Sequence, residues 1–449
     1  MPAGHFDTKA SAWLTSSGQT AFEFTPGGMA NDSGMRPGMV TSTLSGARRR
    51  RGRQGGIVAK TADIVIIGGG INGTSIAFHL ARKGVKNILL LEKGHIASGP
   101  TGRSSGVVRQ HYTVETLAKM ARDSVKRFQN FAEEVGGDAG FVQAGAVFVC
   151  SDENAAALRK TVEMHRRLGI NESLLLPDEL RELEPALSLE GIALGAYEPD
   201  GGYADPALAA NSFCEAAERL GAEVLRRTRV TGLKAEAGRI AGVVTEGGEV
   251  STRTVVNVAG PWGREIAGMV NVEIPIYVTR HPVVILQRPP QWRNPTPVWV
   301  DLVEGWYHKP ERSAALMIGS IHNMGPEQQV DIEAHATVPS YEEIESFSEA
   351  CLKRFPLMSE GLAQGGWAGL YDMTPDSQPV IDRVPEVEGF YCAVGFSGHG
   401  FKLGPAVGTA MSELVLEGQC RTYDLTPFRF TRFREGRLTR GAYEYSIIG

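Results

Sequence analysis

The chain has 449 residues, of which 42% are apolar and 22% are charged, and it carries a net charge of −5 at pH 7. This length is too great for one ordinary core and indicates two globular domains. The negative charge gives no general attraction to nucleic acid or anionic lipid, and no apolar run approaches the roughly 20 residues of a membrane span. The 5 scattered cysteines predict free thiols, a cytoplasmic location and no metal site.

The first 56 residues differ from the rest of the chain. They carry a net charge of +4, against −9 for the remainder, and they are rich in Gly, Ser, Thr and Ala. We expect a disordered tail over residues 1–56. A targeting peptide is the alternative, but a strand follows "RRRRGR", where a secretory signal requires an apolar stretch. Met29, Met35 and Met39 are alternative start positions.

Order is expected to begin at residues 62–94, "ADIVIIGGGINGTSIAFHLARKGVKNILLLEKG". A buried strand leads into Gly68-x-Gly70-x-x-Gly73, an amphipathic helix follows, and a second strand ends at Glu92. A βαβ unit of this length that ends in an acid is the context of a dinucleotide-binding fingerprint. The glycines let the backbone approach a pyrophosphate at the helix N-terminus, and Glu92 is expected to accept hydrogen bonds from a ribose.

A Gly/Ser-rich stretch follows the acid, where a nicotinamide-binding domain would begin a helix. Together with four further motifs it resembles the glycine/D-amino-acid oxidase family of flavoproteins, which includes sarcosine oxidases and dimethylglycine dehydrogenases. The motifs are the "EK" pair at 92–93, "VVRQHY" at 107–112, "VVNVAGPW" at 255–262 and "GFSGHGFK" at 395–402. The resemblance covers about residues 61–422.

The resemblance implies an α/β fold in which a Rossmann-like FAD-binding domain is interleaved with a smaller α+β substrate domain on an antiparallel or mixed sheet. The expected parts are the FAD-binding segments 61–140, 203–262 and 366–422, the substrate-domain segments 141–202 and 263–365, and a C-terminal extension, 423–449.

The glycine-rich stretch at 395–405 joins an apolar run to an apolar periodic segment. The resemblance implies that this loop passes along the flavin ring, where only glycine permits close backbone approach. We expect Pro405 in the first turn of the following helix, where a missing amide costs nothing. The helix N-terminus would then favour negative charge on the reduced ring.

The cofactor implied by the resemblance is FAD. Its expected contacts are Gly68, Gly70, Ile71, Asn72, Gly73, Glu92, Lys93, Thr101, Gly102, Ser104, Ser105, Val230, Gly260, Trp262, Gly395, Gly398, His399, Gly400 and Lys402. Some relatives link the flavin to a cysteine or a histidine. Gly369 stands at the cysteine position, and the loop 100–106 contains no histidine. We therefore expect non-covalent FAD.

Two cations carry the expected substrate site. In sarcosine oxidases the residues that match Arg109 and Lys402 hold the substrate carboxylate, with a bidentate fork and a point charge. The ordinary alternatives are an arginine paired with a buried acid and a lysine that reaches solvent. Tyr307, His308 and His399 are further candidates. Tyr307 and His308 are neighbours on one expected strand, so at most one of them faces the site.

Other positions carry weaker signals. Tyr371 and Asp382 lie near the family's flavin-contacting stretch, although Asp382 could as well cap a turn. His281 and His322 fit ordinary core or surface histidines. Monomeric sarcosine oxidases use a lysine to help oxygen react, and Met317 occupies that position here. This departure weakens the case for an oxidase and leaves room for a dehydrogenase.

These observations predict FAD-dependent oxidation of a small amine that bears a carboxylate, either an N-methyl amino acid of the sarcosine type or a D-amino acid. Hydride transfer to flavin N5 would give an imine that hydrolyses. The electron acceptor would be oxygen, a quinone or an electron-transfer protein. Two alternatives remain: a flavoprotein subunit of a hetero-oligomeric amino-acid dehydrogenase, and a non-catalytic FAD-containing scaffold, which would need no carboxylate clamp.

Overall fold

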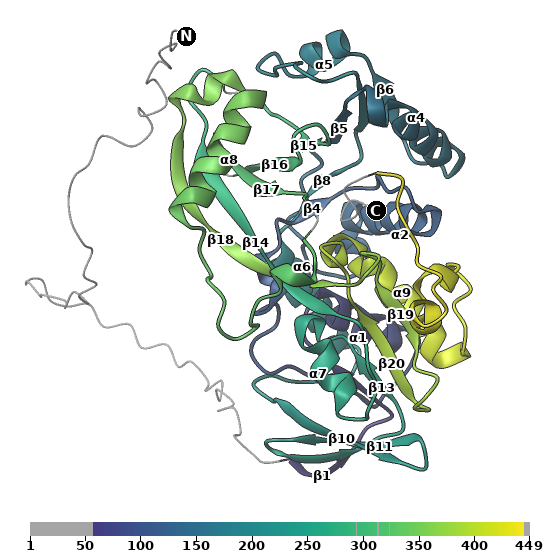
Figure 1. Cartoon of the computed structure of the whole chain (residues 1–449). Helices are drawn as coiled ribbons and strands as arrows, with labels where there is room; N and C mark the ends of the chain where they lie inside the picture. The colour runs from purple at the N-terminus through teal and green to yellow at the C-terminus, as the bar shows by residue number, and fades with distance from the viewer. Residues whose placement is uncertain (1–56, 293, 312–313, 323, 444–449) are drawn as a thin grey trace, which may run out of the picture. The chain divides into compact units, whose positions relative to one another are not determined.

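The computed structural model describes residues 57–443 except 293, 312, 313 and 323 (Figure 1). The tail predicted over residues 1–56 lies outside the described residues. Within the described part, no helix combines the length and apolar character that crossing a membrane would require.

A six-stranded sheet carries the βαβ unit. Its strand order is β19-β20-β13-β2-β3-β9, and the pairs from β20 to β9 are parallel, while the edge pair β19–β20 is antiparallel. The predicted strand–helix–strand segment is β2, α1 and β3. The bounds are β2 (Ile64–Ile67), α1 (Ile71–Arg82), β3 (Ile88–Leu91), β9 (Glu223–Leu225), β13 (Val255–Asn257), β19 (Val380–Arg383) and β20 (Phe390–Val394). This parallel core confirms the predicted α/β class.

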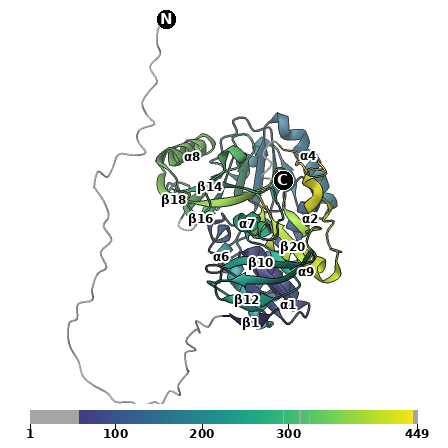
Figure 2. The same cartoon turned by 60° about the horizontal axis from the view of Figure 1, so that its bottom comes forward.

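Strand β2 is apolar on both faces because both faces of this sheet are covered. Ile64 and Ile66 pack toward the helices, whereas Val65 and Ile67 pack toward a four-stranded sheet of order β1-β12-β11-β10. Figures 1 and 2 show the strands β1 and β10 of this sheet grouped together. The helices are α2 (Glu115–Gln129), α6 (Pro206–Arg219) and α9 (Gly400–Glu417), together with α1. The strands are β1 (Ile57–Thr61), β10 (Val230–Glu236), β11 (Arg239–Thr245) and β12 (Gly248–Ser251).

An eight-stranded mixed sheet forms the second large layer. Its order is β18-β14-β17-β16-β15-β5-β7-β6; the β15–β5 pair is parallel and the other pairs are antiparallel. The bounds are β5 (Ala146–Cys150), β6 (Ser173–Leu175), β7 (Leu194–Glu198), β14 (Tyr277–Gln287), β15 (Val298–Asp301), β16 (Trp306–Glu311), β17 (Ala315–Ser320) and β18 (Leu362–Met373). The domain boundaries stay a prediction.

Short elements complete the chain. Strand β4 (Val107–Val108) pairs with β8 (Gly202–Tyr203). The remaining helices are α3 (Phe131–Glu134), α4 (Asp152–Arg167), α5 (Pro177–Leu183), α7 (Gly263–Gly268) and α8 (Tyr341–Arg354). Figure 1 shows α8 beside the long strands β14 and β18.

The prediction that Pro405 lies in the first turn of its helix is wrong, because α9 begins at Gly400 and Pro405 lies inside it. Proline has no amide hydrogen, so Pro405 donates no backbone hydrogen bond within the helix. The next amide, that of Ala406, donates to the side chain of Ser124, at 3.2 Å from Oγ. As a result, Lys402 stands in the first turn of α9 and not in the loop before it.

Candidate functional site

The turn between β2 and α1 depends on two glycines. Gly68 has φ +119°, and a Cβ there would lie 2.4 Å from the Val258 carbonyl oxygen. A Cβ at Gly73 would lie 1.9 Å from the carbonyl oxygen of Gly68. A side chain at either position is therefore incompatible with the turn. The first intrahelical bond runs from the Thr74 amide to the Gly70 carbonyl at 3.0 Å, so the amides of Asn72 and Gly73 are not used within the helix and can face an anion.

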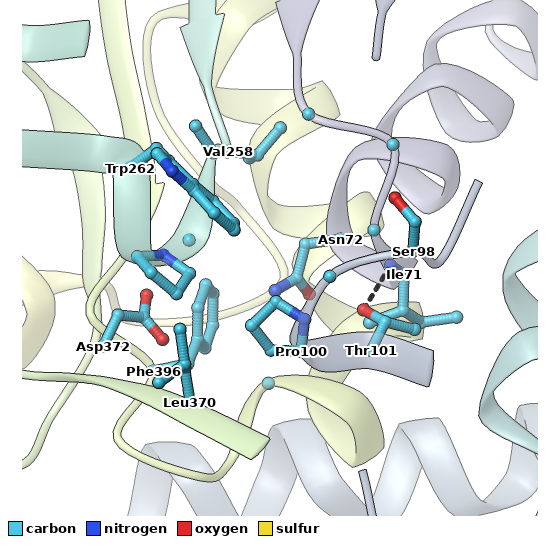
Figure 3. Close-up of a pocket in the computed structure, with 18 of the residues that line it drawn as sticks. Ile71, Asn72, Ser98, Pro100, Thr101, Val258, Trp262, Leu370, Asp372 and Phe396 are labelled. Carbon is cyan, nitrogen blue, oxygen red and sulfur yellow. Dashed lines mark hydrogen bonds between the residues drawn. The ribbon is translucent and has the colours of Figure 1, made fainter. Parts of the chain in front are cut away.

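Glu92 stands at the end of β3 and is held by backbone amides. Its two carboxylate oxygens accept hydrogen bonds from the amides of Gly69 at 2.7 Å and Gly94 at 2.6 Å. The Ile71 amide donates to Thr101 Oγ1 at 3.1 Å, which fixes the Gly/Ser-rich loop against the turn (Figure 3). A carboxylate oxygen has more than one lone pair, so Glu92 can still accept a ribose hydroxyl.

These elements line a large cavity. Trp262 forms one side of it, and Leu370, Asp372 and Phe396 lie across from that ring (Figure 3). The expected cofactor residues in its lining are Gly68, Gly70, Ile71, Asn72, Glu92, Lys93, Thr101, Ser104, Ser105, Val230, Gly260, Trp262, Gly398 and Gly400.

The other expected cofactor residues are placed differently. Gly73 packs on Gly68, and a Cβ at Gly102 would lie 2.3 Å from the Ala97 carbonyl oxygen. A Cβ at Gly395 would lie 2.4 Å from a methyl group of Thr374. These three glycines shape the turns behind the lining. His399 is fully buried at the N-terminus of α9, with its ring 5.3 Å from that of Tyr112.

The cavity fits the predicted FAD. The glycine turn has no room for a side chain at Gly68 or Gly73, as expected of a turn whose backbone lies close to a pyrophosphate, and Glu92 stands beside it at the end of β3. Asn72 Oδ1 is buried and lacks a hydrogen-bond partner among the described residues, although it lines this cavity. A buried polar atom of this kind requires a partner, and a bound cofactor would supply one.

A second cavity, of about 50 Å³, adjoins the first and brings Arg109 and Lys402 together. The two cavities share Ser105, Tyr307, Tyr371 and Gly398. The rest of its lining is Val107, Arg109, Val300, Ser320, Ile321 and Lys402. This volume admits only a small molecule, which would lie next to whatever occupies the larger cavity.

The Arg109 side chain is buried and held in place. Its guanidinium carbon lies 4.2 Å from the centre of the Tyr112 ring, and Nη1 donates to the carbonyl oxygen of His111. A cation over an aromatic face is stabilised by the ring quadrupole. From this position Arg109 lines the small cavity.

Lys402 has a different environment. Its side chain is buried, and Nζ donates to the Gly398 carbonyl oxygen at 3.4 Å. Burial first, and then the charge of Arg109, lower the pKa of Lys402 well below its usual value. None of the described carboxylates forms an ion pair with this ammonium group.

Alternation along β16 separates Tyr307 from His308. Tyr307 lines both cavities, and burial raises the pKa of its phenol. His308 faces the opposite side of the sheet, with its ring 4.9 Å from Phe355 and 5.5 Å from Trp306. Burial lowers the pKa of His308 to about 3, which keeps it neutral in an aromatic cluster. This position removes His308 from the two cavities.

Strands β14 and β18 contribute residues that the sequence argument set aside or missed. His281 and Tyr371 line the large cavity with their rings stacked at 3.8 Å. Asp372 also lines it, accepts a hydrogen bond from the Gly395 amide at 2.7 Å, and has its pKa raised to about 6 by burial. The sequence motif at 368–376, "AGLYDMTPD", could have drawn attention to Tyr371 and Asp372. Their partners on β14 are far away in sequence, so the motif does not reveal those contacts.

The remaining weak candidates have structural surroundings. Asp382 accepts a hydrogen bond from the Phe430 amide at 2.8 Å and so anchors the C-terminal extension. His322 is exposed. Met317 is buried in β17, opposite Lys309 of β16.

A buried hydrogen-bonded network stands behind Arg109. Glu172 binds His111 Nδ1 at 2.6 Å through one oxygen and His165 Nδ1 at 2.5 Å through the other. The second nitrogen of His111 contacts the Tyr443 hydroxyl at 2.8 Å, and that of His165 contacts the Tyr112 carbonyl oxygen at 2.8 Å. The three titratable side chains are close enough to hold a metal ion, but every ring nitrogen already has a protein partner. This network supports the backbone that carries Arg109.

The chain is similar to several proteins that are named as amino-acid oxidases or dehydrogenases. The sarcosine dehydrogenase of Mus musculus mitochondria is 28% identical over 412 residues, which is 86% of this chain and 44% of that protein. The sarcosine oxidase subunit beta of Rhodobacter capsulatus is 26% identical over 385 residues, 84% of this chain and 90% of that protein. The crystal structure of L-proline dehydrogenase from P. horikoshii has 32% identity and a TM-score of 0.78, covering 85% of this chain and 100% of that one.

The chain spans about half the length of the mitochondrial relatives that it matches. The family model described as FAD dependent oxidoreductase matches residues 63–414, which include the glycine turn, the Gly/Ser-rich loop, Arg109 and Lys402. The chain therefore belongs to the DAO family of FAD-dependent oxidoreductases.

Proposed function

We propose that this protein oxidises a small amino acid at its C–N bond, with the substrate carboxylate held between Arg109 and Lys402. The observation that carries the proposal is the small cavity, where these two buried basic side chains meet next to the cavity that fits FAD. The printed names of similar proteins support it, since they include sarcosine dehydrogenase, glycine oxidase and L-proline dehydrogenase. An N-methyl amino acid such as sarcosine is our first candidate, and a D-amino acid is the second.

Each residue of the small cavity has a role in this proposal. FAD supplies the ring that accepts a hydride. Arg109 binds both carboxylate oxygens with its fork, and Lys402 adds a second contact from α9. Tyr307 and Tyr371 separate the substrate from solvent and orient the C–H bond toward the larger cavity. The hydride leaves carbon with both electrons of the C–H bond, and water hydrolyses the resulting imine to a carbonyl compound and an amine.

Anaerobic reduction of the bound flavin by a panel of amino acids tests this function. Each N-methyl or D-amino acid should be paired with the amine that lacks its carboxylate, for example sarcosine with dimethylamine. We expect the flavin to bleach with at least one amino acid, and about tenfold or more slowly with its paired amine, because a charge-assisted contact is lost. Equal rates for acid and amine, or no bleaching with any amino acid, would contradict the proposal.

We also propose that FAD is bound without a covalent link. Gly369 has no side chain for a link, and the loop 100–106 offers none. His281 lines the cavity, but its Nε2 lies 2.9 Å from Thr279 Oγ1 and its ring stacks on Tyr371. Acid precipitation should release the flavin into the supernatant. Flavin in the pellet that disappears in the His281→Ala variant would show that His281 carries a link.

We propose that the electron acceptor is a quinone or an electron-transfer protein rather than oxygen. A buried methionine, Met317, provides no charge to stabilise reduced oxygen. Oxygen should therefore react with reduced flavin about tenfold to a thousandfold more slowly than an artificial dye, the usual scale for one missing charged group in a transition state. Comparable rates would contradict this acceptor.

One relative is named as a subunit, so native mass measurement should also be made on the purified protein.

A further inference from the structure

We propose that Lys402 is uncharged before the substrate binds, and that its Nζ accepts a proton from the substrate ammonium group. One side chain would then generate the reactive neutral amine and become the second cation beside the carboxylate. This inference rests on the proposed function and adds a proton-transfer role to Lys402.

The position of Lys402 disfavours an ammonium ion in three ways. The side chain is only 8% exposed, so little water solvates a charge. The residue stands in the first turn of α9, where the positive end of the helix dipole lies. Arg109 lines the same small cavity and adds a permanent positive charge. All three effects favour the neutral amine.

The other titratable side chains that line the cavity do not offset these effects. Tyr307 on β16 and Tyr371 on β18 are the titratable side chains that line it besides Arg109 and Lys402. Burial raises the pKa of both phenols, so both stay neutral. His399, the neighbour at the start of α9, is fully buried as well. The lowered pKa of Lys402 agrees with this geometry.

Lys309 provides an internal comparison. It is buried to a similar degree, at 4% exposure, and it stands on the neighbouring sheet strand β16. Its ammonium group forms an ion pair with Glu311, which offsets part of the lowering of the pKa of Lys309 by burial. Among the described lysines, Lys309 and Lys402 are the buried ones. Lys309 has a carboxylate partner within the protein, whereas a carboxylate for Lys402 would arrive with the substrate.

The proton balance of the proposed step is simple. A free amino acid at neutral pH carries an ammonium group, which has no lone pair to assist loss of a hydride. On binding, one N–H bond of that ammonium breaks and a bond between the proton and Lys402 Nζ forms. The substrate becomes a neutral amine with a carboxylate, and Lys402 becomes an ammonium ion next to that carboxylate. No proton is exchanged with solvent, because the substrate supplies the one that Lys402 accepts.

A carboxylate without an amine tests this step, because it cannot supply the proton. Acetate should be titrated into the FAD-loaded protein over a pH series and followed by the flavin absorbance, with acetamide as the uncharged control. At pH values above the pKa that Lys402 has in the ligand-free protein, wild-type affinity for acetate should fall by about tenfold per pH unit. The reason is that Lys402 must take up one proton from solvent when acetate binds. Acetate affinity should be independent of pH in Lys402→Met and Lys402→Arg, because neither side chain accepts a proton.

Anaerobic flavin reduction by an amino acid provides the second part of the test. In the wild type the ratio of reduction rate to dissociation constant should be flat between the pKa of Lys402 and the pKa of the substrate's own amine. In Lys402→Arg, which keeps a cation, the ratio should rise about tenfold per pH unit up to the pKa of the substrate's own amine. Flavin content per chain confirms that each variant is folded.

The outcomes separate the two proposals. Acetate binding that is independent of pH in the wild type, or that stays pH-dependent in Lys402→Met, would overturn the proton-transfer role while leaving the carboxylate site intact. A wild-type protein that binds neither acetate nor any amino acid would overturn the proposed function, and this inference with it.

Discussion

The two adjoining cavities are built in different ways. One part of the FAD cavity is made from backbone, namely a glycine turn and the end of one strand, whereas side chains such as Trp262 and Phe396 line the rest. The small cavity is made from side chains that strands β4, β15, β16, β17 and β18 and helix α9 bring together. A backbone site leaves a contiguous motif in the sequence, whereas a site made of side chains depends on the packing that holds each of them. The comparison predicts that substitutions should act on cofactor binding in one cavity and on carboxylate selectivity in the other.

The largest effect is expected at the glycine turn of the FAD cavity. Gly73→Ala places a Cβ 1.9 Å from the Gly68 carbonyl oxygen, so the turn must open. We expect FAD affinity to fall by about a hundredfold or more, because the cradle at the helix N-terminus is lost. Flavin per chain after gel filtration measures this effect. Gly268→Ala is the matched control, since nothing lies within 4 Å of its Cβ, and it should keep full flavin.

Arg109→Lys tests the small cavity. Lysine keeps the charge but loses the fork, so the Michaelis constant for the amino acid should rise by about tenfold to a hundredfold. Oxidation of an amine that lacks the carboxylate should change little, and FAD content should stay at the wild-type value. If Arg109→Lys lost FAD and kept its preference for substrates with a carboxylate, Arg109 would belong to the cofactor site, and the proposed separation of the two cavities would be wrong.

Glu172→Gln tests the support behind Arg109. Burial by itself would raise the pKa of Glu172, but His111 and His165 outweigh it and lower this pKa to about 2. The folded-state pKa lies below that of the unfolded chain, so the stabilisation is present above the usual carboxyl pKa near 4.5 and is lost as pH falls toward 2. At neutral pH the variant should be less stable by about 3 kcal/mol, the usual cost of breaking a buried charged contact.

Denaturant unfolding at neutral and acidic pH measures this loss. The difference between wild type and Glu172→Gln should narrow as pH falls through the window from the usual carboxyl pKa toward 2. Tyr443→Phe removes the hydroxyl that contacts His111. This second variant should lower the free energy of unfolding by about 1 kcal/mol. A constant difference at all pH values would show that the carboxylate of Glu172 is not the stabilising group.

The smallest effect is expected at the exposed rim of the FAD cavity. The Lys93 ammonium lies 3.4 Å from the centre of a Trp262 ring, and Glu333 accepts hydrogen bonds from both side chains. Glu333 is largely exposed, so Glu333→Gln should speed FAD release by only about twofold to fivefold. Stopped-flow flavin fluorescence measures this rate. Glu345→Gln, on the exposed side of α8, should show no change.

The parts of the molecule that sequence could predict are the local ones. The βαβ unit, Glu92 and the glycine turn are contiguous, and their chemistry follows from residue type and spacing. The predicted position of Pro405 is wrong because tolerance of a proline inside a helix depends on tertiary contacts, such as that of the Ala406 amide with Ser124 Oγ, 282 residues apart in sequence.

The network behind Arg109 could not be predicted for the same reason. His111 and Glu172 are 61 residues apart, and His111 and Tyr443 are 332 residues apart. Nothing in the local pattern of any of these segments marks a partner at such a distance. The stacking of His281 on Tyr371 likewise follows from the pairing of β14 with β18 and not from either strand alone.

A crystal structure of the FAD-loaded protein with a bound small carboxylate would show directly whether Arg109 and Lys402 hold a carboxylate. Our account predicts the carboxylate in the small cavity, with its oxygens within about 3.2 Å of the Arg109 guanidinium and the Lys402 Nζ, and with the rest of the ligand facing the flavin. A carboxylate that binds elsewhere in the protein, or that lies in this cavity without contacting either side chain, would contradict the account.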